Sequence, residues 1–130
     1  MAWYLDTSAA VKLVVAEPHA PALRSWLAGT GERLVSSDLL RTELLRATRR
    51  AAPDRLRRAR AVLDGIDLLT PAPATFERAA ELEPAVLRSL DALHLATALE
   101  LGDDLDGIVV YDRRLAEAAA RLGLVVQAPV

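Results

Sequence analysis

Short apolar runs alternate along the chain with longer segments in which apolar residues recur at helical spacing. The runs that favour strands lie at 2–5, 34–35, 67–71, 107–111 and 124–127. The segments that favour helices lie at 9–14, 20–27, 39 to just before Pro53, Pro53 to Gly65, 75–82, 89–101 and 113–122. This alternation predicts one α/β domain over residues 1–130, with a central parallel sheet of four or five short strands and helices on both faces.

Two aspartates follow predicted strands and precede predicted helices. Asp6 comes directly after the run 2–5, and Asp112 comes directly after the run 107–111. The carboxyl ends of parallel strands line one crevice, so these two side chains are expected to lie near each other. Capping of the next helix is the alternative role for either aspartate taken alone.

Two further acids lie on predicted helices. Asp91 occupies the first turn of an apolar helix, where it would also favour the positive helix end. Glu43 lies in the first or second turn of its helix, within reach of Arg46 for an ordinary ion pair. Four converging carboxylates would repel one another unless they were protonated or shared a cation. Oxygen ligands suit Mg²⁺ or Mn²⁺, so the pattern predicts phosphate-ester hydrolysis with one or two such ions.

The amino-acid composition limits which side chains could bind a metal or act in catalysis. The chain has no cysteine, which excludes disulfides, cysteine nucleophiles and thiolate-bound zinc. The apolar runs are far shorter than the roughly 20 residues of a membrane-spanning helix. Its first residues resemble no secretory signal, so a cytoplasmic protein without membrane contact is expected.

Charge is distributed unevenly although the formal net charge is only −2. The window 41–60 holds eight arginines against two acids. Arg46, Arg49 and Arg50 are the candidate RNA-binding residues of this window, because arginine steers and binds a phosphate backbone. A solvated surface without a ligand is the alternative.

Four motifs resemble those of a known family: Tyr4-Leu5-Asp6-Thr7-Ser8-Ala9, Glu43-Leu44, Leu90-Asp91-Ala92-Leu93-His94-Leu95-Ala96-Thr97-Ala98 and Tyr111-Asp112-Arg113-Arg114-Leu115. With them the chain resembles a PIN-domain toxin of the VapC type over nearly its whole length. The resemblance implies a cytoplasmic endoribonuclease that depends on Mg²⁺ or Mn²⁺ and slows translation. It also implies a homodimer and a VapB-like antitoxin that inserts a C-terminal segment near the active site.

The resemblance implies roles for particular residues. Asp6, Glu43 and Asp91 would be the main metal carboxylates, and Asp112 would complete the acidic pocket. Thr7 and Ser8 would orient a carboxylate or a water, with helix capping as the alternative. Many relatives carry a small hydroxyl residue two positions before the last acid, where this chain has Val110, so any contact from that hydroxyl is missing.

Other residues receive structural interpretations. His94 lies near the helix face of Asp91, which suggests a ligand or acid–base role, but in the resembled motif it packs within the helix. We therefore interpret it as structural. Trp3 and Trp26 are interpreted as core residues rather than platforms for bases. Leu39, Leu40, Leu44 and Leu45 exceed one core-facing stripe, which suggests a groove for an antitoxin helix or a dimer interface.

Two alternatives to a metal-dependent ribonuclease stay open at this point. A catalytically inert PIN-like module would use the fold only to contact RNA or a protein. A haloacid-dehalogenase-like phosphatase would use Asp6 as a nucleophile, but that chemistry usually needs a second aspartate where this chain has Ser8. It also lacks a late lysine, because Lys12 is the only one.

Overall fold

A five-stranded parallel sheet forms the centre of the molecule. The computed structural model describes residues 1–130 and orders the strands β3-β2-β1-β4-β5. Their bounds are β1 Ala2–Leu5, β2 Arg33–Ser37, β3 Asp67–Leu69, β4 Leu105–Val109 and β5 Val126–Gln127. Every neighbouring pair is parallel. The predicted α/β fold with a parallel sheet is confirmed.

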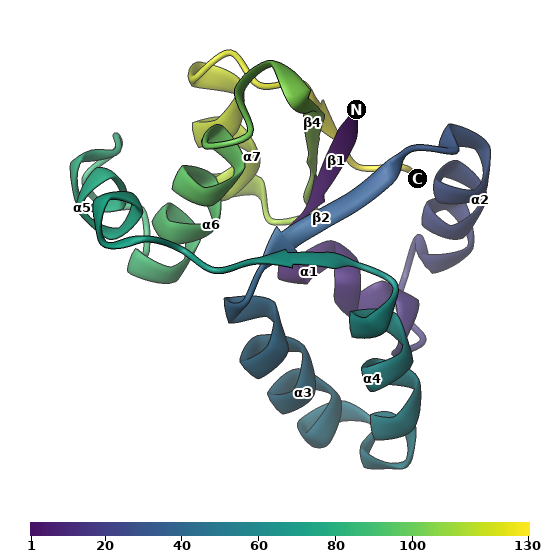
Figure 1. The fold of residues 1–130 in the computed structure, drawn as a ribbon. Coiled ribbons are helices and arrows are strands. Elements are labelled where there is room, and N and C mark those ends of the chain that lie inside the picture. The colour runs from purple at the N-terminus through teal and green to yellow at the C-terminus, as the bar shows by residue number, and fades with distance from the viewer.

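Seven α-helices cover the two faces of the sheet (Figure 1). They are α1 Thr7–Ala10, α2 Ala20–Thr30, α3 Leu39–Ala51, α4 Leu56–Asp64, α5 Pro73–Glu81, α6 Ser89–Leu99 and α7 Arg113–Arg121. Helices α6 and α7 lie on one face and α1 to α4 on the other, while α5 packs on the outside of α6 (Figure 1). None of these helices combines the length and apolarity needed to cross a bilayer.

The central strands β1 and β4 are mostly buried on both faces, so their side chains divide between two cores. Tyr4 and Ile108 pack with Leu95 and Leu115 under α6 and α7. Leu5 packs instead with the core beneath α1 to α4. Trp3 and Trp26 pack against that second core with their ring centroids 4.8 Å apart, as expected from the sequence.

Strand β4 ends two residues earlier than the apolar run predicts. The run extends to Tyr111, but the paired segment stops at Val109. Beyond it, the backbone N–H of Tyr111 donates to the Ser8 hydroxyl rather than to a neighbouring strand. Val110 is buried among the residues under α6 and α7. Asp112 therefore follows a two-residue connection, Val110 and Tyr111, whose second residue is tied to Ser8.

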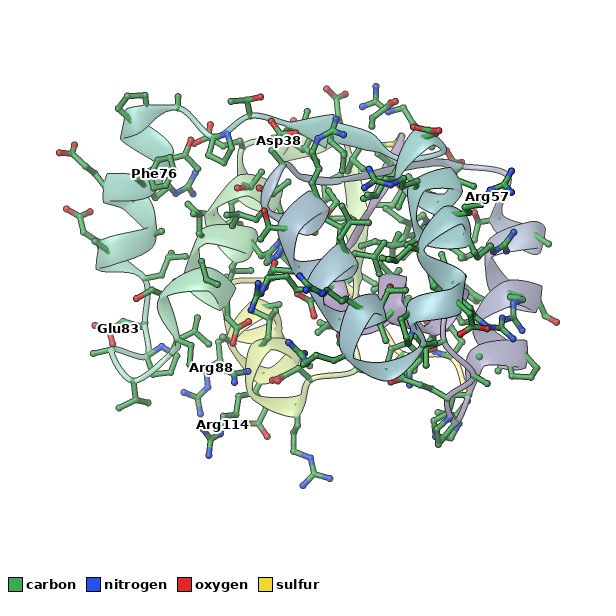
Figure 2. The ribbon with its side chains drawn as sticks, turned by 90° about the horizontal axis from the view of Figure 1, so that it is seen from below. Asp38, Arg57, Phe76, Glu83, Arg88 and Arg114 are labelled. Atoms are coloured by element: carbon green, nitrogen blue, oxygen red, sulfur yellow. The ribbon has the colours of Figure 1, made fainter.

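The predicted apolar groove along α3 is wrong. Leu40 and Leu44 are fully buried in the core, and Leu39 and Leu45 are half-buried against it. Helix α3 packs against α1 and α4, and Leu39 reaches the separate cluster formed by residues of α5 and α6, so all four leucines are used in packing. Exposed apolar side chains gather elsewhere, at α5 and the start of α6, where Phe76 projects from α5 (Figure 2).

Candidate functional site

Asp6 stands at the carboxyl end of the central strand. Its backbone N–H donates to the carbonyl of Val109, which fixes the end of β1 beside the end of β4. Its carboxylate caps α1, accepting from the Ser8 N–H at 3.1 Å and the Ser8 hydroxyl at 2.6 Å through Oδ2. The residue is only 4% exposed. A carboxylate held so rigidly and so deeply is typical of a site built around it rather than of a surface cap.

The two hydroxyl residues after Asp6 each hold another part of the site. Ser8 accepts a hydrogen bond from the Tyr111 N–H at 2.9 Å, which ties the connection before Asp112 to the end of β1. Thr7 donates to Oε1 of Glu43 at 2.9 Å. The expectation that Thr7 and Ser8 orient carboxylates therefore agrees with their contacts.

Glu43 is held from a second side by a fully buried histidine. His94 Nε2 lies 2.5 Å from Glu43 Oε1, and His94 Nδ1 lies 2.7 Å from the Tyr4 hydroxyl. Burial alone would lower the pKa of His94, but the hydrogen bond to Glu43 and the charges of Asp6, Glu43 and Asp91 raise it. Burial alone would raise the pKa of Glu43, but the His94 and Thr7 contacts and the Arg88 charge bring it below its ordinary value. His94 is buried as predicted, yet it positions an acid of the site.

Arg88 joins the other two acids. Its Nε lies 3.0 Å from Asp91 Oδ2 and its Nη2 lies 3.2 Å from Asp112 Oδ2. Asp112 also caps α7 by accepting from the Leu115 N–H at 3.1 Å, so both the capping and the clustering interpretations hold for it. Burial raises the pKa of Asp91, the charges of Asp6 and Asp112 raise it further, and Arg88 offsets part of this. The pKa of Arg88 is raised in turn by Asp91, Asp112 and Asp6.

The four predicted acids thus share one neighbourhood, but they do not close into a cage. No three histidine or carboxylate side chains are arranged to hold a metal ion between them. Oε1 of Glu43 is directed to Thr7 and His94, and Arg88 lies across Asp91 and Asp112. Each acid instead has a nearby donor or positive charge of its own, which offsets the repulsion between like charges.

The predicted RNA-binding arginines lie apart from these contacts. Arg46, Arg49 and Arg50 are exposed on α3 and form no ion pair with any acid of the chain. Their role in RNA binding stays a prediction.

Arg88 and Tyr4 are the residues of the site that sequence reasoning missed. Arg88 stands three positions before Asp91, a spacing at which side chains meet on a helix, and it is one of only two basic residues between Val62 and Asp112. The spacing of Arg88 and Asp91 was therefore enough to indicate their contact. Tyr4 gave no signal, because nothing in an apolar strand indicates which buried side chain its hydroxyl meets.

Comparison with known proteins finds relatives over nearly the whole chain. A family model described as PIN domain matches residues 3–121. Ribonuclease VapC47 of Mycobacterium tuberculosis (strain CDC 1551 / Oshkosh) is 42% identical over 130 residues, covering 97% of this chain and 96% of the relative. Ribonuclease VapC46 of M. tuberculosis (strain ATCC 25618 / H37Rv) is 44% identical over 126 residues, with the same coverage of both chains.

Solved structures show the same fold. The crystal structure of M. tuberculosis VapC20, described as a sarcin-ricin loop cleaving toxin, superposes with a TM-score of 0.76 at 15% identity, over 98% of this chain and 99% of that one. A toxin–antitoxin complex from Klebsiella pneumoniae superposes with a TM-score of 0.69 at 18% identity, over 98% of this chain and 97% of that one. At these identities the structures support the fold alone.

Proposed function

The chain belongs to the PIN-domain family of VapC-type ribonucleases, and from this premise we propose that it is an endoribonuclease dependent on Mg²⁺ or Mn²⁺. It acts as the toxin of a toxin–antitoxin pair and slows translation by cutting RNA in the cytoplasm. The observation that carries the proposal is the shared charge environment of Asp6, Asp91 and Asp112: Arg88 pairs with Asp91 and Asp112, and the charge of Asp6 acts on both Arg88 and Asp91. The family membership replaces the haloacid-dehalogenase-like alternative.

The donor set fits a hard divalent cation. Asp6 and Asp112 place carboxylate oxygens after β1 and β4, and the pKa of Asp91 is raised by burial and, to a smaller extent, by the negative charges of Asp6 and Asp112. Mg²⁺ keeps several of its waters and needs only one or two carboxylates, so an open arrangement is sufficient. Asp6 and Asp91 would hold the ion, with Asp112 completing the pocket and Glu43 facing it. When bound, the ion would activate a water for attack on phosphorus and neutralise charge on the scissile phosphate.

The chain's own residues orient this chemistry. Ser8 fixes the Asp6 carboxylate through two hydrogen bonds. Thr7 and His94 both use Oε1 of Glu43, so its other oxygen, Oε2, is left to accept a hydrogen bond from a water. The lowered pKa of Glu43 keeps it ionised at neutral pH, as a proton acceptor must be.

The direct test is cleavage of RNA by the purified protein with and without metal. We expect cleavage with Mg²⁺ or Mn²⁺, loss of cleavage in EDTA, and recovery when either ion is added back. Sequencing of RNA ends after induced expression, compared with Asp91→Asn, identifies the RNA that is cut.

An inert PIN-like module would give a different result. It would bind RNA or a partner protein but yield no new RNA ends, with or without metal. Cleavage that persists in EDTA, or in Asp91→Asn, would contradict the metal-dependent mechanism.

Partners form part of the same proposal. The antitoxin is a VapB-like protein, and the toxin is a homodimer. An apolar hollow between α5 and α6 supports the dimer, since nine of its ten lining residues are hydrophobic. Phe76 and Leu90 on its rim are 52% and 49% exposed. A second copy would bury this surface, as two-fold interfaces join the same patch on both subunits.

We expect the double variant Phe76→Ser and Leu90→Ser to be monomeric where the wild type is dimeric, because it removes the apolar rim without touching the core. Light scattering after gel filtration measures the mass. Val125→Ser is the matched control, since Val125 is also 52% exposed but lies outside the hollow, and it should leave the dimer intact. A monomeric wild type would contradict the dimer.

A further inference from the structure

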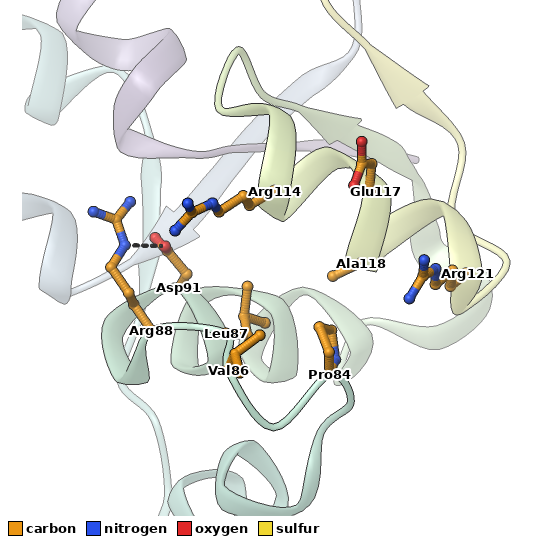
Figure 3. A pocket seen from close by; sticks show the side chains of 9 residues that line it. All are labelled: Pro84, Val86, Leu87, Arg88, Asp91, Arg114, Glu117, Ala118 and Arg121. Atoms are coloured by element: carbon orange, nitrogen blue, oxygen red, sulfur yellow. Dashed lines mark hydrogen bonds and ion pairs between the residues drawn. The ribbon is translucent and has the colours of Figure 1, made fainter.

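A groove runs outward from Asp91 between the segment 84–88 and α7. One wall is formed by Pro84, Val86 and Leu87, and the other by Arg114 and Arg121 on α7 (Figure 3). Its volume is about 520 Å³. Because Asp91 and Arg88 stand at one end, any molecule in this groove would meet the acidic site directly.

The groove carries unpaired positive charge. Arg114 and Arg121 are exposed and form no ion pair or hydrogen bond through their guanidinium groups, in contrast to Arg88. They stand seven residues apart on the same face of α7, a rise of about 10 Å along the helix. Glu117, between them on α7, also lines the groove and leaves it one net positive charge from these three residues, and its carboxylate is directed away from the 84–87 segment (Figure 3). Two cations at this spacing suit an extended polyanion better than a single small anion.

The opposite wall is apolar and open to solvent. Val86 is 89% exposed, beside Pro84 and Leu87. A single-stranded nucleic acid presents both charged phosphates and the apolar faces of its bases. The two walls therefore match the two sides of such a strand, whereas an acidic peptide would leave the Val86 wall without a partner.

We infer that this groove holds single-stranded RNA on one side of the cleaved bond, with Arg114 and Arg121 on phosphates and Val86 against a base. The inference rests on the proposed ribonuclease function and adds the path of its substrate. Arg88, between the groove and the acids, marks the point where the strand reaches them. The path differs from the one predicted for Arg46, Arg49 and Arg50. Those three arginines lie on α3, whereas Arg114 and Arg121 lie on α7, and Arg88 and Arg114 project from one side of the molecule (Figure 2).

Binding without cleavage tests the groove. Fluorescence anisotropy of a labelled single-stranded RNA of mixed sequence is measured in EDTA at several salt concentrations, with the full-length protein. We expect Arg114→Gln with Arg121→Gln to weaken binding about tenfold and to lower the salt slope by about 1.4, since each single-strand phosphate contact contributes about 0.7. The Lys variants at both positions should keep the slope. Val86→Asp should also weaken binding.

Variants that remove arginines at other places on the surface test whether RNA binding depends on the groove. Arg24→Gln with Arg60→Gln removes two exposed arginines elsewhere and should leave binding unchanged. Loss of binding in Arg46→Gln, Arg49→Gln and Arg50→Gln, with none in the groove variant, would overturn the inference. So would tighter binding of polyglutamate than of RNA. A wild type that binds RNA through Arg114 and Arg121 but never cuts it would refute the proposed function and leave the groove standing.

Discussion

Asp6→Asn is expected to lower the rate of RNA cleavage about 10³-fold, because several kcal/mol of ion-dependent stabilisation are lost at about 1.4 kcal/mol for each tenfold change in rate. The fold should persist. An asparagine oxygen still accepts from the Ser8 N–H, and asparagine caps helices as well as aspartate does. Removal of one like charge beside Asp91 should leave the melting temperature equal to or above that of the wild type. Cleavage at saturating Mn²⁺ and thermal unfolding measure the two effects.

Asp38→Asn is the control for this substitution. Asp38 follows β2 as Asp6 follows β1, and it stands at the start of α3, but it pairs with Arg41 and Thr70. Figure 2 places it far from Arg88. Hydrogen bonds from Thr70 and Arg41 lower the pKa of Asp38, so its variant should lose a little stability and no cleavage activity. Equal loss of cleavage in the two variants, or none in Asp6→Asn, would contradict the role proposed for Asp6.

The placement of Asp6 and Asp112 was predictable because it depends on sheet topology alone. Short apolar runs separated by helices require a parallel sheet, and such a sheet brings the ends of neighbouring strands to one edge. Strands β1 and β4 are neighbours, so the two aspartates follow adjacent strand ends. No knowledge of side-chain packing was needed. The early end of β4 was less predictable, since Val110 is buried and still donates its backbone N–H to the carbonyl of Gln127 in β5, although the paired segment ends at Val109.

The contacts that couple the acids were not predictable in the same way. The spacing of Arg88 and Asp91 indicates their pairing, but the contact with Asp112 spans 24 positions and depends on how α6 meets α7. The prediction of a groove along the α3 leucines failed for a similar reason. A sequence shows which faces of a helix are apolar, but not which neighbouring elements will cover them. Helix α3 packs against α1 and α4, and its Leu39 also meets residues of α5 and α6.

The interpretation of His94 as structural captured its burial but not its contacts. Residues 92–98 are all buried, so the sequence around His94 reads as apolar on every side. Its two partners come from β1 and α3, which are distant in the chain. A buried imidazole needs partners for both nitrogens, and here one of them is an acid of the proposed metal site. His94 is thus a positioning residue, which acts through Glu43.

His94→Asn and His94→Gln separate its two contacts. Asparagine places its amide near the position of Nδ1, toward Tyr4, and glutamine reaches the position of Nε2, toward Glu43. We expect the Asn variant to need about 10- to 100-fold more Mn²⁺ for half-maximal activity, as is typical when a residue that orients a ligand is lost. It should also lose about 1–3 kcal/mol of stability, because a half-buried carboxylate loses its donor. The Gln variant should stay close to the wild type in its Mn²⁺ requirement.

The pH dependence of stability gives a readout independent of catalysis. The pKa of His94 is raised above its ordinary value of 6.5, so its contact with Glu43 stabilises the fold fully below that pH and is lost as pH rises through the folded-state pKa. The melting temperature of the wild type should therefore fall as pH rises from about 6.5, and that of His94→Gln should fall less. Other titrating groups are present in both proteins and cancel in the comparison. Parallel curves, together with equal Mn²⁺ requirements for the Asn and Gln variants, would show that His94 only fills space in the core.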